Sequence, residues 1–236
     1  EMCIRDSYLT ARSGDLLAEQ AKSIAEEFGV QVEYGTCDLL KDGELEAMLE
    51  DANEKFGGID IQFNNCGGPP RLLPSEADEK LWRKWFDVIV MSAVKATGHA
   101  LPNMQKEGWG RVLTMTSSNI YNASVVNVLS SSLRMALVGW SKALCKEVAK
   151  NGITVNCLVP GRIYTDRVRA GDEVRGEHLG ISAKEAREQM INNAPMGRDG
   201  KIEEMGALAA MLCGVPAGYI NGSVLRADGG RVGVNF

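Results

Sequence analysis

The chain alternates between two hydrophobic periods along most of its length. Apolar residues recur at helical spacing at Leu17, Ala21, Ile24 and Phe28 and stop at Gly29, and "VQVEY" then alternates as a strand does. Further helix-then-strand couplets cover 45–56 and 59–63, 79–106 and 111–116, and 131–150 and 153–159. Helices that alternate with short, mostly apolar strands predict a parallel sheet covered on both faces. The expected fold class is therefore a doubly wound α/β domain.

Composition narrows the class of protein. The 236 residues are 44% hydrophobic and 24% charged, which is typical of a single globular domain. Twenty-six basic against thirty-one acidic residues, without a basic cluster, argue against a nucleic-acid partner. Without an apolar run of ~18 to 20 residues or a signal-peptide pattern, we expect no membrane contact and a cytoplasmic protein. Six scattered cysteines and two histidines suggest neither a disulfide framework nor a metal site.

Two segments are set apart from the regular pattern. The opening "EMCIRDS", residues 1–7, resembles a translated sequencing adapter, so we interpret it as an assembly scar and assign the domain to 8–236. The alternative is a genuine short N-terminus; a scar would mean that the natural protein begins further upstream. The least regular region, 162–200, is rich in charge and glycine, and its part from about 166 to 200 is predicted to be a mobile lid over a site.

Short motifs fall at or near the carboxyl ends of the predicted strands. They are "NNCG" at 64–67, "TSS" at 116–118, "PGRIYT" at 160–165 and "ADGG" at 227–230. That edge of an open α/β sheet is where ligands bind. In this order the motifs resemble the short-chain dehydrogenase/reductase family, which has a Rossmann fold. The strings "GWGRV", "GITVN" and "GYINGS" look most like its 3-oxoacyl-(acyl carrier protein) reductase-like members.

The resemblance implies a dinucleotide site along this edge. Asp38 matches the acidic residue near the adenine ring, and Arg12 would suit the 2'-phosphate of NADP because a guanidinium forks onto phosphate oxygens. NADP is therefore the expected cofactor, with NAD possible. Taken singly, Asp38 would be an ordinary turn cap and Arg12 a solvated charge. The other positions implied, beside the adenosine or along the nicotinamide and pyrophosphate, are Asn64, Asn65, Gly67, Pro160, Gly161, Ile163 and Thr165.

The family's glycine-rich phosphate loop, Thr-Gly-x-x-x-Gly-x-Gly, does not occur in the sequence. In the family this loop follows the first strand, which lies at the centre of the sheet in the order 3-2-1-4-5-6. We therefore expect a truncated domain that lacks its first strand and this loop, with the second and third strands cut off from the rest. The chain alone is then predicted not to form a native sheet, and a sharp cooperative unfolding transition would contradict this.

The catalytic segment of the family is present in register but altered. Members place a tyrosine thirteen residues after a serine, a lysine four residues later, and an asparagine on the preceding helix. Here Ser117 is retained, while Ser130, Arg134 and Val90 occupy the other three positions. The string "MALVGWSKAL", which matches the family's helix beyond its lysine, fixes that register.

These replacements leave two hypotheses open. An alkyl hydroxyl is a weaker acid than a phenol, and arginine stays charged, so the usual proton route is missing. Tyr121 is the phenol in this stretch and a candidate acid, or else an ordinary loop aromatic. The chain is then either an NAD(P)-dependent oxidoreductase acting on a small carbonyl or alcohol substrate, or a non-catalytic dinucleotide-binding or assembly subunit. The resemblance also implies a homodimer or homotetramer.

Overall fold

The computed structural model describes residues 6–192 and 194–233. Residues 1–5 of the predicted scar lie outside this part, while Ser7 already begins the first strand, so the domain boundary at residue 8 stays a prediction. The strands are β1 (Ser7–Ala11), β2 (Val32–Thr36), β3 (Ile61–Asn64), β4 (Gly110–Met115), β5 (Ile153–Pro160) and β6 (Val224–Ala227). The α-helices are α1 (Gly14–Phe28), α2 (Glu44–Phe56), α3 (Glu79–Phe86), α4 (Ser92–Glu107), α5 (Val128–Val148), α6 (Asp166–Leu179), α7 (Ala183–Asn192) and α8 (Ile202–Cys213).

The strands form two parallel sheets. β1 pairs with β2, and β3, β4, β5 and β6 form a four-stranded sheet in that order. No strand pairing joins β1 to β3 within residues 6–192 and 194–233. The predicted α/β fold with a parallel sheet is confirmed.

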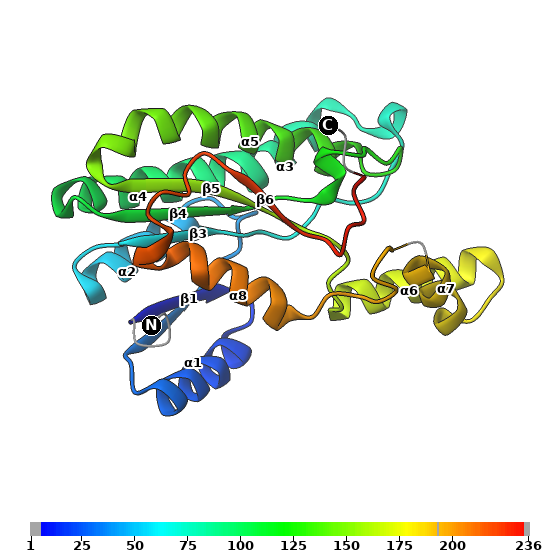
Figure 1. Ribbon diagram of the computed structural model, residues 1–236, viewed down its shortest axis with the longest axis horizontal. Helices are drawn as coiled ribbons and strands as arrows, with labels where there is room; N and C mark the ends of the chain where they lie inside the picture. The colour runs from blue at the N-terminus through cyan, green and yellow to red at the C-terminus, as the bar shows by residue number, and fades with distance from the viewer. Residues whose placement is uncertain (1–5, 193, 234–236) are drawn as a thin grey trace.

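Helices cover both faces of the four-stranded sheet (Figure 1). α4 and α5 pack on one face, against β3, β4 and β5, and α8 packs on the other, against β4 and β6. α1 lies against β1 and β2, and α2 bridges β2 to α4. In this arrangement the two central strands, β4 and β5, are enclosed on both faces, which explains why most of their residues are apolar.

The core lies along β4 and β5. Val112, Val155 and Leu158 are completely buried; the apolar face of α5 packs on the two valines, and α8 packs on Leu158 from the other side. Full burial of each such side chain stabilises the fold by roughly 1.5–3 kcal/mol. This core therefore holds the carboxyl ends of β4 and β5 rigidly, where the family motifs lie.

The long helix predicted over 79–106 is divided. A π-helical turn, Asp87–Met91, joins α3 to α4. Its three apolar side chains, Val88, Ile89 and Val90, are buried against α5. The apolar pattern predicted a helix here, but it did not reveal the wider turn, because a π turn shifts the helix face by a single residue.

The segment predicted to be least regular is mainly helical. α6 and α7 pack against each other and project from the end of the sheet (Figure 1). The Thr165 hydroxyl caps α6 by accepting from the Val168 amide at 3.4 Å, and Ser182 and Glu185 form reciprocal bonds at the start of α7. Apolar periodicity missed both helices because few of their residues are buried. A lid role for this segment stays a prediction.

Within the described residues, no helix combines the length and apolar character needed to cross a membrane.

Candidate active site

The polar positions predicted from sequence gather along one edge of the sheets. Arg12 follows β1, Asp38 follows β2, Asn64 ends β3, Ser117 lies two residues beyond β4, and Pro160 ends β5. Within each sheet all strand pairs are parallel, so the carboxyl ends of its strands lie at one edge. This edge of the four-stranded sheet carries the catalytic-side candidates with Asn64 and Pro160, and the corresponding edge of the two-stranded sheet carries Arg12 and Asp38.

Arg134 is the most constrained of the candidates. Its residue is 7% exposed, Nη1 donates to the Met115 carbonyl at 2.8 Å, and Nη2 donates to the Cys66 carbonyl at 3.4 Å. These bonds tie α5 to the ends of β3 and β4. Burial lowers the pKa of Arg134, but a guanidinium remains charged at any working pH. The structure therefore holds a fixed positive charge at the edge of the sheet.

Ser117 and Ser130 both precede Arg134 in the chain. Ser117 begins a short 3-10 turn, 118–120, and its Oγ accepts from the Asn119 amide at 3.2 Å. Ser130 is half-buried in the first turn of α5, four residues before Arg134, so both side chains project from one face of the helix. Val90, in contrast, belongs to the apolar core and offers no polar group.

Tyr121 lies on the same turn as Ser117 but points outward. Its side chain is 49% exposed, and its ring centroid is 5.5 Å from the Arg226 guanidinium of β6. Its amide donates to the Ser118 carbonyl at 3.1 Å. The phenol is thus directed toward the last strand, and about half of the residue is open to solvent.

Asn64 is used mainly to join structural elements. Its Nδ2 donates to Thr97 Oγ1 at 3.0 Å and to Thr114 Oγ1 at 3.3 Å, and Oδ1 accepts from the Gln62 side chain at 3.0 Å. The buried amide therefore links β3 to α4 and β4. Asn65 and Gly67 beyond it are exposed, and a Cβ built on Gly67 would meet nothing within 4 Å.

Asp38 has the local role of a turn cap. Its Oδ1 accepts from the Leu40 amide at 3.0 Å, and its own amide donates to Glu44 Oε2 at 2.7 Å. Arg12 is exposed, and among the described residues it forms no ion pair. A free guanidinium at the end of β1 remains suited to an anion.

The loop after β5 is held closely against the C-terminal strand. The Gly161 amide donates to the Ala227 carbonyl at 2.9 Å, and a Cβ on Gly161 would lie 2.5 Å from Asp228 Cα. Since that clash is with backbone, only glycine fits. Ile163 pairs with Gly200, which closes the base of the α6–α7 segment.

An ion-pair network at this base was missed by sequence reasoning. Arg162 Nε donates to Asp199 Oδ1 at 2.7 Å, and its Nη2 bonds to Asp172. Arg187 Nε donates to the other Asp199 oxygen at 2.9 Å. The two aspartates are ten and thirty-seven residues from Arg162 in the chain, so no periodic signal could have linked them.

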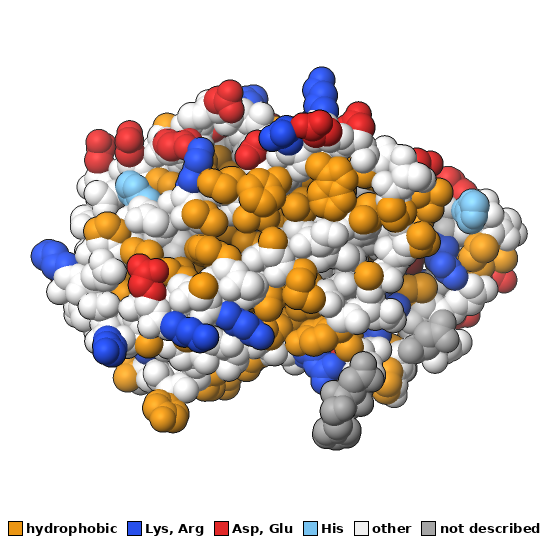
Figure 2. All heavy atoms as spheres, turned by 90° about the horizontal axis from the view of Figure 1, so that it is seen from above, with side chains coloured by type: hydrophobic (Ala, Val, Ile, Leu, Met, Phe, Trp, Pro, Cys, Tyr) orange, Lys and Arg blue, Asp and Glu red, His pale blue; other side chains and the backbone are white. Residues whose placement is uncertain are grey.

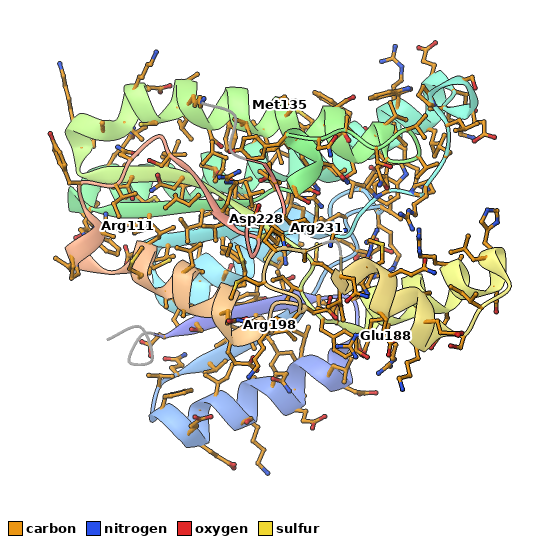
Figure 3. The ribbon with its side chains drawn as sticks, turned by 45° about the vertical axis from the view of Figure 1, so that its right-hand side comes forward. Arg111, Met135, Glu188, Arg198, Asp228 and Arg231 are labelled. Atoms are coloured by element: carbon orange, nitrogen blue, oxygen red, sulfur yellow. The ribbon has the colours of Figure 1, made fainter. Side chains whose placement is uncertain are left out.

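A cavity of about 340 Å³ opens next to this network. Figure 3 shows Asp228 and Arg231 beyond the end of β6, with Arg198 nearer to α8. Arg198 is neutralised by Glu204, whose carboxylate oxygens lie 2.6 and 2.7 Å from its nitrogens. The lining residues are Arg162, Ile163, Ala194, Met196, Arg198, Gly200, Glu204, Arg226, Ala227, Asp228, Gly229, Gly230 and Arg231.

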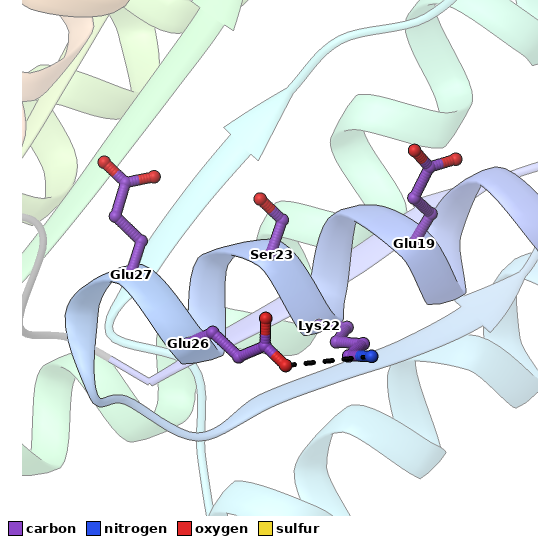
Figure 4. A pocket seen from close by; sticks show the side chains of 5 residues that line it. All are labelled: Glu19, Lys22, Ser23, Glu26 and Glu27. Atoms are coloured by element: carbon purple, nitrogen blue, oxygen red, sulfur yellow. Dashed lines mark ion pairs between the residues drawn. The ribbon is translucent and has the colours of Figure 1, made fainter.

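A second, open hollow of about 480 Å³ runs along α1 (Figure 4). It is lined only by Glu19, Lys22, Ser23, Glu26 and Glu27, and Lys22 pairs with Glu26 at 3.8 Å. All five belong to one helix and none to a strand end. The carboxyl edge, with its fixed charge, glycine contacts and adjoining cavity, is therefore the candidate active site.

A parallel sheet with polar motifs along its carboxyl edge defines the class of dinucleotide-binding α/β proteins. The family model described as "Enoyl-(Acyl carrier protein) reductase" matches residues 6–231. The chain belongs to the short-chain dehydrogenase/reductase family.

Three relatives illustrate the match. The D-beta-hydroxybutyrate dehydrogenase of Cupriavidus necator is 31% identical over 220 residues, covering 93% of this chain and 85% of the relative. The 3-oxoacyl-[acyl-carrier-protein] reductase FabG of Aquifex aeolicus is 28% identical, covering 94% and 85%. The structure of L-sorbose reductase from Gluconobacter frateurii, complexed with NADPH and L-sorbose, is 30% identical with a TM-score of 0.91, covering 97% and 87%. The predicted class, an NAD(P)-dependent oxidoreductase, is confirmed, and the NADPH in that complex agrees with the expected cofactor.

Proposed function

We propose that this protein interconverts a carbonyl and an alcohol by NADP-linked hydride transfer at the carboxyl edge of its sheet. One observation carries the proposal. Arg134 is buried and bonded to the Met115 carbonyl at 2.8 Å, two residues before Ser117. A fixed cation and a hydroxyl at the end of one rigid strand suit a carbonyl oxygen that gains negative charge during reduction.

The residues present fit a dinucleotide. Arg12 offers a free guanidinium for a 2'-phosphate, Gly67 leaves space beside the adenosine, and the Gly161 loop lies close to the C-terminal strand. When bound, the dinucleotide supplies or accepts the hydride. The chain itself must then orient the substrate and move one proton.

We assign the orienting role to Ser117 and Arg134. The Ser117 hydroxyl would donate to the substrate oxygen, and the Arg134 guanidinium would stabilise the negative charge that develops on it. Neither the arginine nor an alkyl hydroxyl is a good proton donor at neutral pH. We therefore propose Tyr121 as the acid, which requires its exposed side chain to turn from Arg226 toward the substrate.

Single substitutions test these roles. Ser117→Ala should lower kcat about 100-fold, within the range typical of losing a donor to a developing oxyanion. Tyr121→Phe should lower kcat by a similar factor, because the hydroxyl that would pass the proton is gone. Tyr219→Phe, a fully exposed tyrosine on the far loop, is the matched control. Unchanged kcat in Tyr121→Phe would remove Tyr121 from the mechanism.

We also propose that one further parallel strand, followed by a glycine-rich loop, fills the space between β1 and β3 in the working protein. The support is that these two strands do not pair and that Phe63 on β3 is 42% exposed. Calorimetry of the 236-residue chain should give no single sharp transition, whereas a chain extended upstream in its natural reading frame should. A sharp transition in the shorter chain would contradict the proposal.

A non-catalytic relative remains the second candidate. Val90 is 6% exposed in an apolar cluster, so no polar group takes the place of the family's asparagine there. Ser130 and Arg134 alter the other two positions. This candidate predicts saturable NADPH binding without turnover, which separates it from the first.

We further propose self-association through the exposed face of α5. Met135 is 47% exposed there, and no charged side chain interrupts the stripe. Figure 2 shows this face of the molecule, where hydrophobic side chains gather toward the middle. An uncharged stripe of small residues on a helix favours close packing with a second copy of the chain. The stripe comprises Ser132, Met135, Ala136, Gly139 and Ala143.

A further inference from the structure

Two guanidinium groups meet at the loop that follows β3. Arg134 donates to the Cys66 carbonyl at 3.4 Å. Arg167, from the first turn of α6, reaches the same loop, since a Cβ built on Gly68 would lie 2.5 Å from its Nη2. One arginine therefore comes from the rigid α5 and the other from the α6–α7 segment.

No carboxylate balances these two charges. Within residues 6–192 and 194–233, neither arginine forms an ion pair. Two acidic residues of α6 are engaged elsewhere, Asp166 with Arg169 at 3.1 Å and Asp172 with Arg162. The charge of Arg167 also acts with burial to lower the pKa of Arg134. A buried cation beside a like charge is costly unless an anion joins them.

We propose that Arg134 and Arg167 together bind an oxyanion group of the substrate, either a carboxylate or a phosphate. This inference rests on the proposed function, because it places the anionic group next to the carbonyl held by Ser117. Guanidinium groups bind both oxyanions through paired, charge-assisted hydrogen bonds. Arg12, which follows β1 in the separate two-stranded sheet, is assigned to the cofactor, so the Arg134–Arg167 pair is left for the substrate.

Matched carbonyl compounds test the preference with NADPH as reductant. Acetoacetate is compared with neutral methyl acetoacetate, and dihydroxyacetone phosphate with dihydroxyacetone. One anionic member should have a kcat/KM at least about 10-fold above its neutral partner, the effect expected for one charged hydrogen bond. The pair of compounds that shows this preference identifies the oxyanion as a carboxylate or a phosphate.

Arg167→Gln should lower kcat/KM for the preferred anionic compound to nearly that of its neutral partner, while kcat/KM for the neutral compound stays the same. Arg167 is exposed, so this change should leave the fold intact. Arg169→Gln, on the next turn and paired with Asp166, is the control and should keep the preference. Equal kcat/KM within both pairs would overturn the inference. So would a rise in the KM for NADPH in Arg167→Gln that is equal with charged and neutral substrates.

Alkylation of Cys66 gives a readout that needs no turnover. Its thiol interacts with both guanidiniums, although burial raises its pKa. Its sulfur displaces iodide from either of two reagents, anionic iodoacetate or neutral iodoacetamide. Peptide mass spectrometry gives the ratio of the two alkylation rates at Cys66, and this ratio is compared with the same ratio at Cys145. An iodoacetate preference at Cys66 that falls in Arg167→Gln, or with added inorganic phosphate, supports the anion site even if no carbonyl is reduced. The same ratio at both cysteines contradicts it, whatever the activity.

Discussion

Arg162 is joined to Asp199 by an ion pair of 2.7 Å that fixes the base of the α6–α7 segment to the end of β5. The Asp199 side chain is almost completely buried, and the same arginine also bonds to buried Asp172. Removing the arginine would leave the buried carboxylate of Asp172 without its ion pair and would leave Asp199 paired with Arg187 alone. Such a change costs about 3–5 kcal/mol for a buried pair.

We therefore expect Arg162→Met to loosen α6 and α7 selectively. Amide hydrogen exchange should speed up across these helices, while β4 and β5 stay protected. Arg169→Gln breaks only an exposed pair with Asp166 and should change stability by less than about 1 kcal/mol. Equal exchange in the two variants would show that the network does not anchor the segment.

The Glu204 carboxylate, at the start of α8, is expected to contribute to the stability of the fold in a pH-dependent way. A hydrogen bond from Arg198, together with one from the Lys201 amide, lowers the pKa of Glu204 to about 2. A carboxyl with a depressed pKa stabilises the fold fully above its unfolded pKa of about 4.3, and this contribution is lost as pH falls toward 2. Wild type should thus melt above Glu204→Gln at pH 6, and the difference should shrink below pH 4. Glu203→Gln, one residue earlier, should show no such pH-dependent gap.

Met135 tests the proposed interface. Met135→Glu puts a charge in the middle of the apolar stripe of α5 and should shift the protein from dimer or tetramer to monomer in sedimentation velocity. Leu16→Glu, at an apolar position of α1 that is even more exposed than Met135, should leave the assembly unchanged. A wild-type monomer would contradict the interface outright.

The sequence predicted the regular helices and buried strands better than the contacts at the edge of the sheet. The helical period located the helix that ends at Gly29. The buried strands β4 and β5 were located as well, because burial on both faces leaves a mostly apolar run of residues. The helices α6 and α7 were not predicted, because too few of their residues are buried to give an apolar periodicity. Their existence depends on caps and on ion pairs that only the folded chain assembles.

The candidate site shows the same limit. Motif order brought Ser117 and Arg134 to one edge of the sheet, and parallel pairing explains why. The part played by Arg167 was not foreseen, because it depends on a contact with Gly68 across about one hundred residues of sequence. Asn64 proved to be tied to Thr97 and Thr114, a use that the motif alone did not indicate.

The most direct test of the central claim is oxidation of NADPH by the protein that includes the further strand and glycine-rich loop proposed above. The reaction is followed by absorbance with acetoacetate and the other carbonyl compounds. We predict carbonyl-dependent oxidation, with NADPH preferred over NADH and that preference reduced in Arg12→Gln. The claim would be contradicted if the folded wild-type chain oxidised no NADPH with any carbonyl while the double variant Ser130→Tyr, Arg134→Lys did.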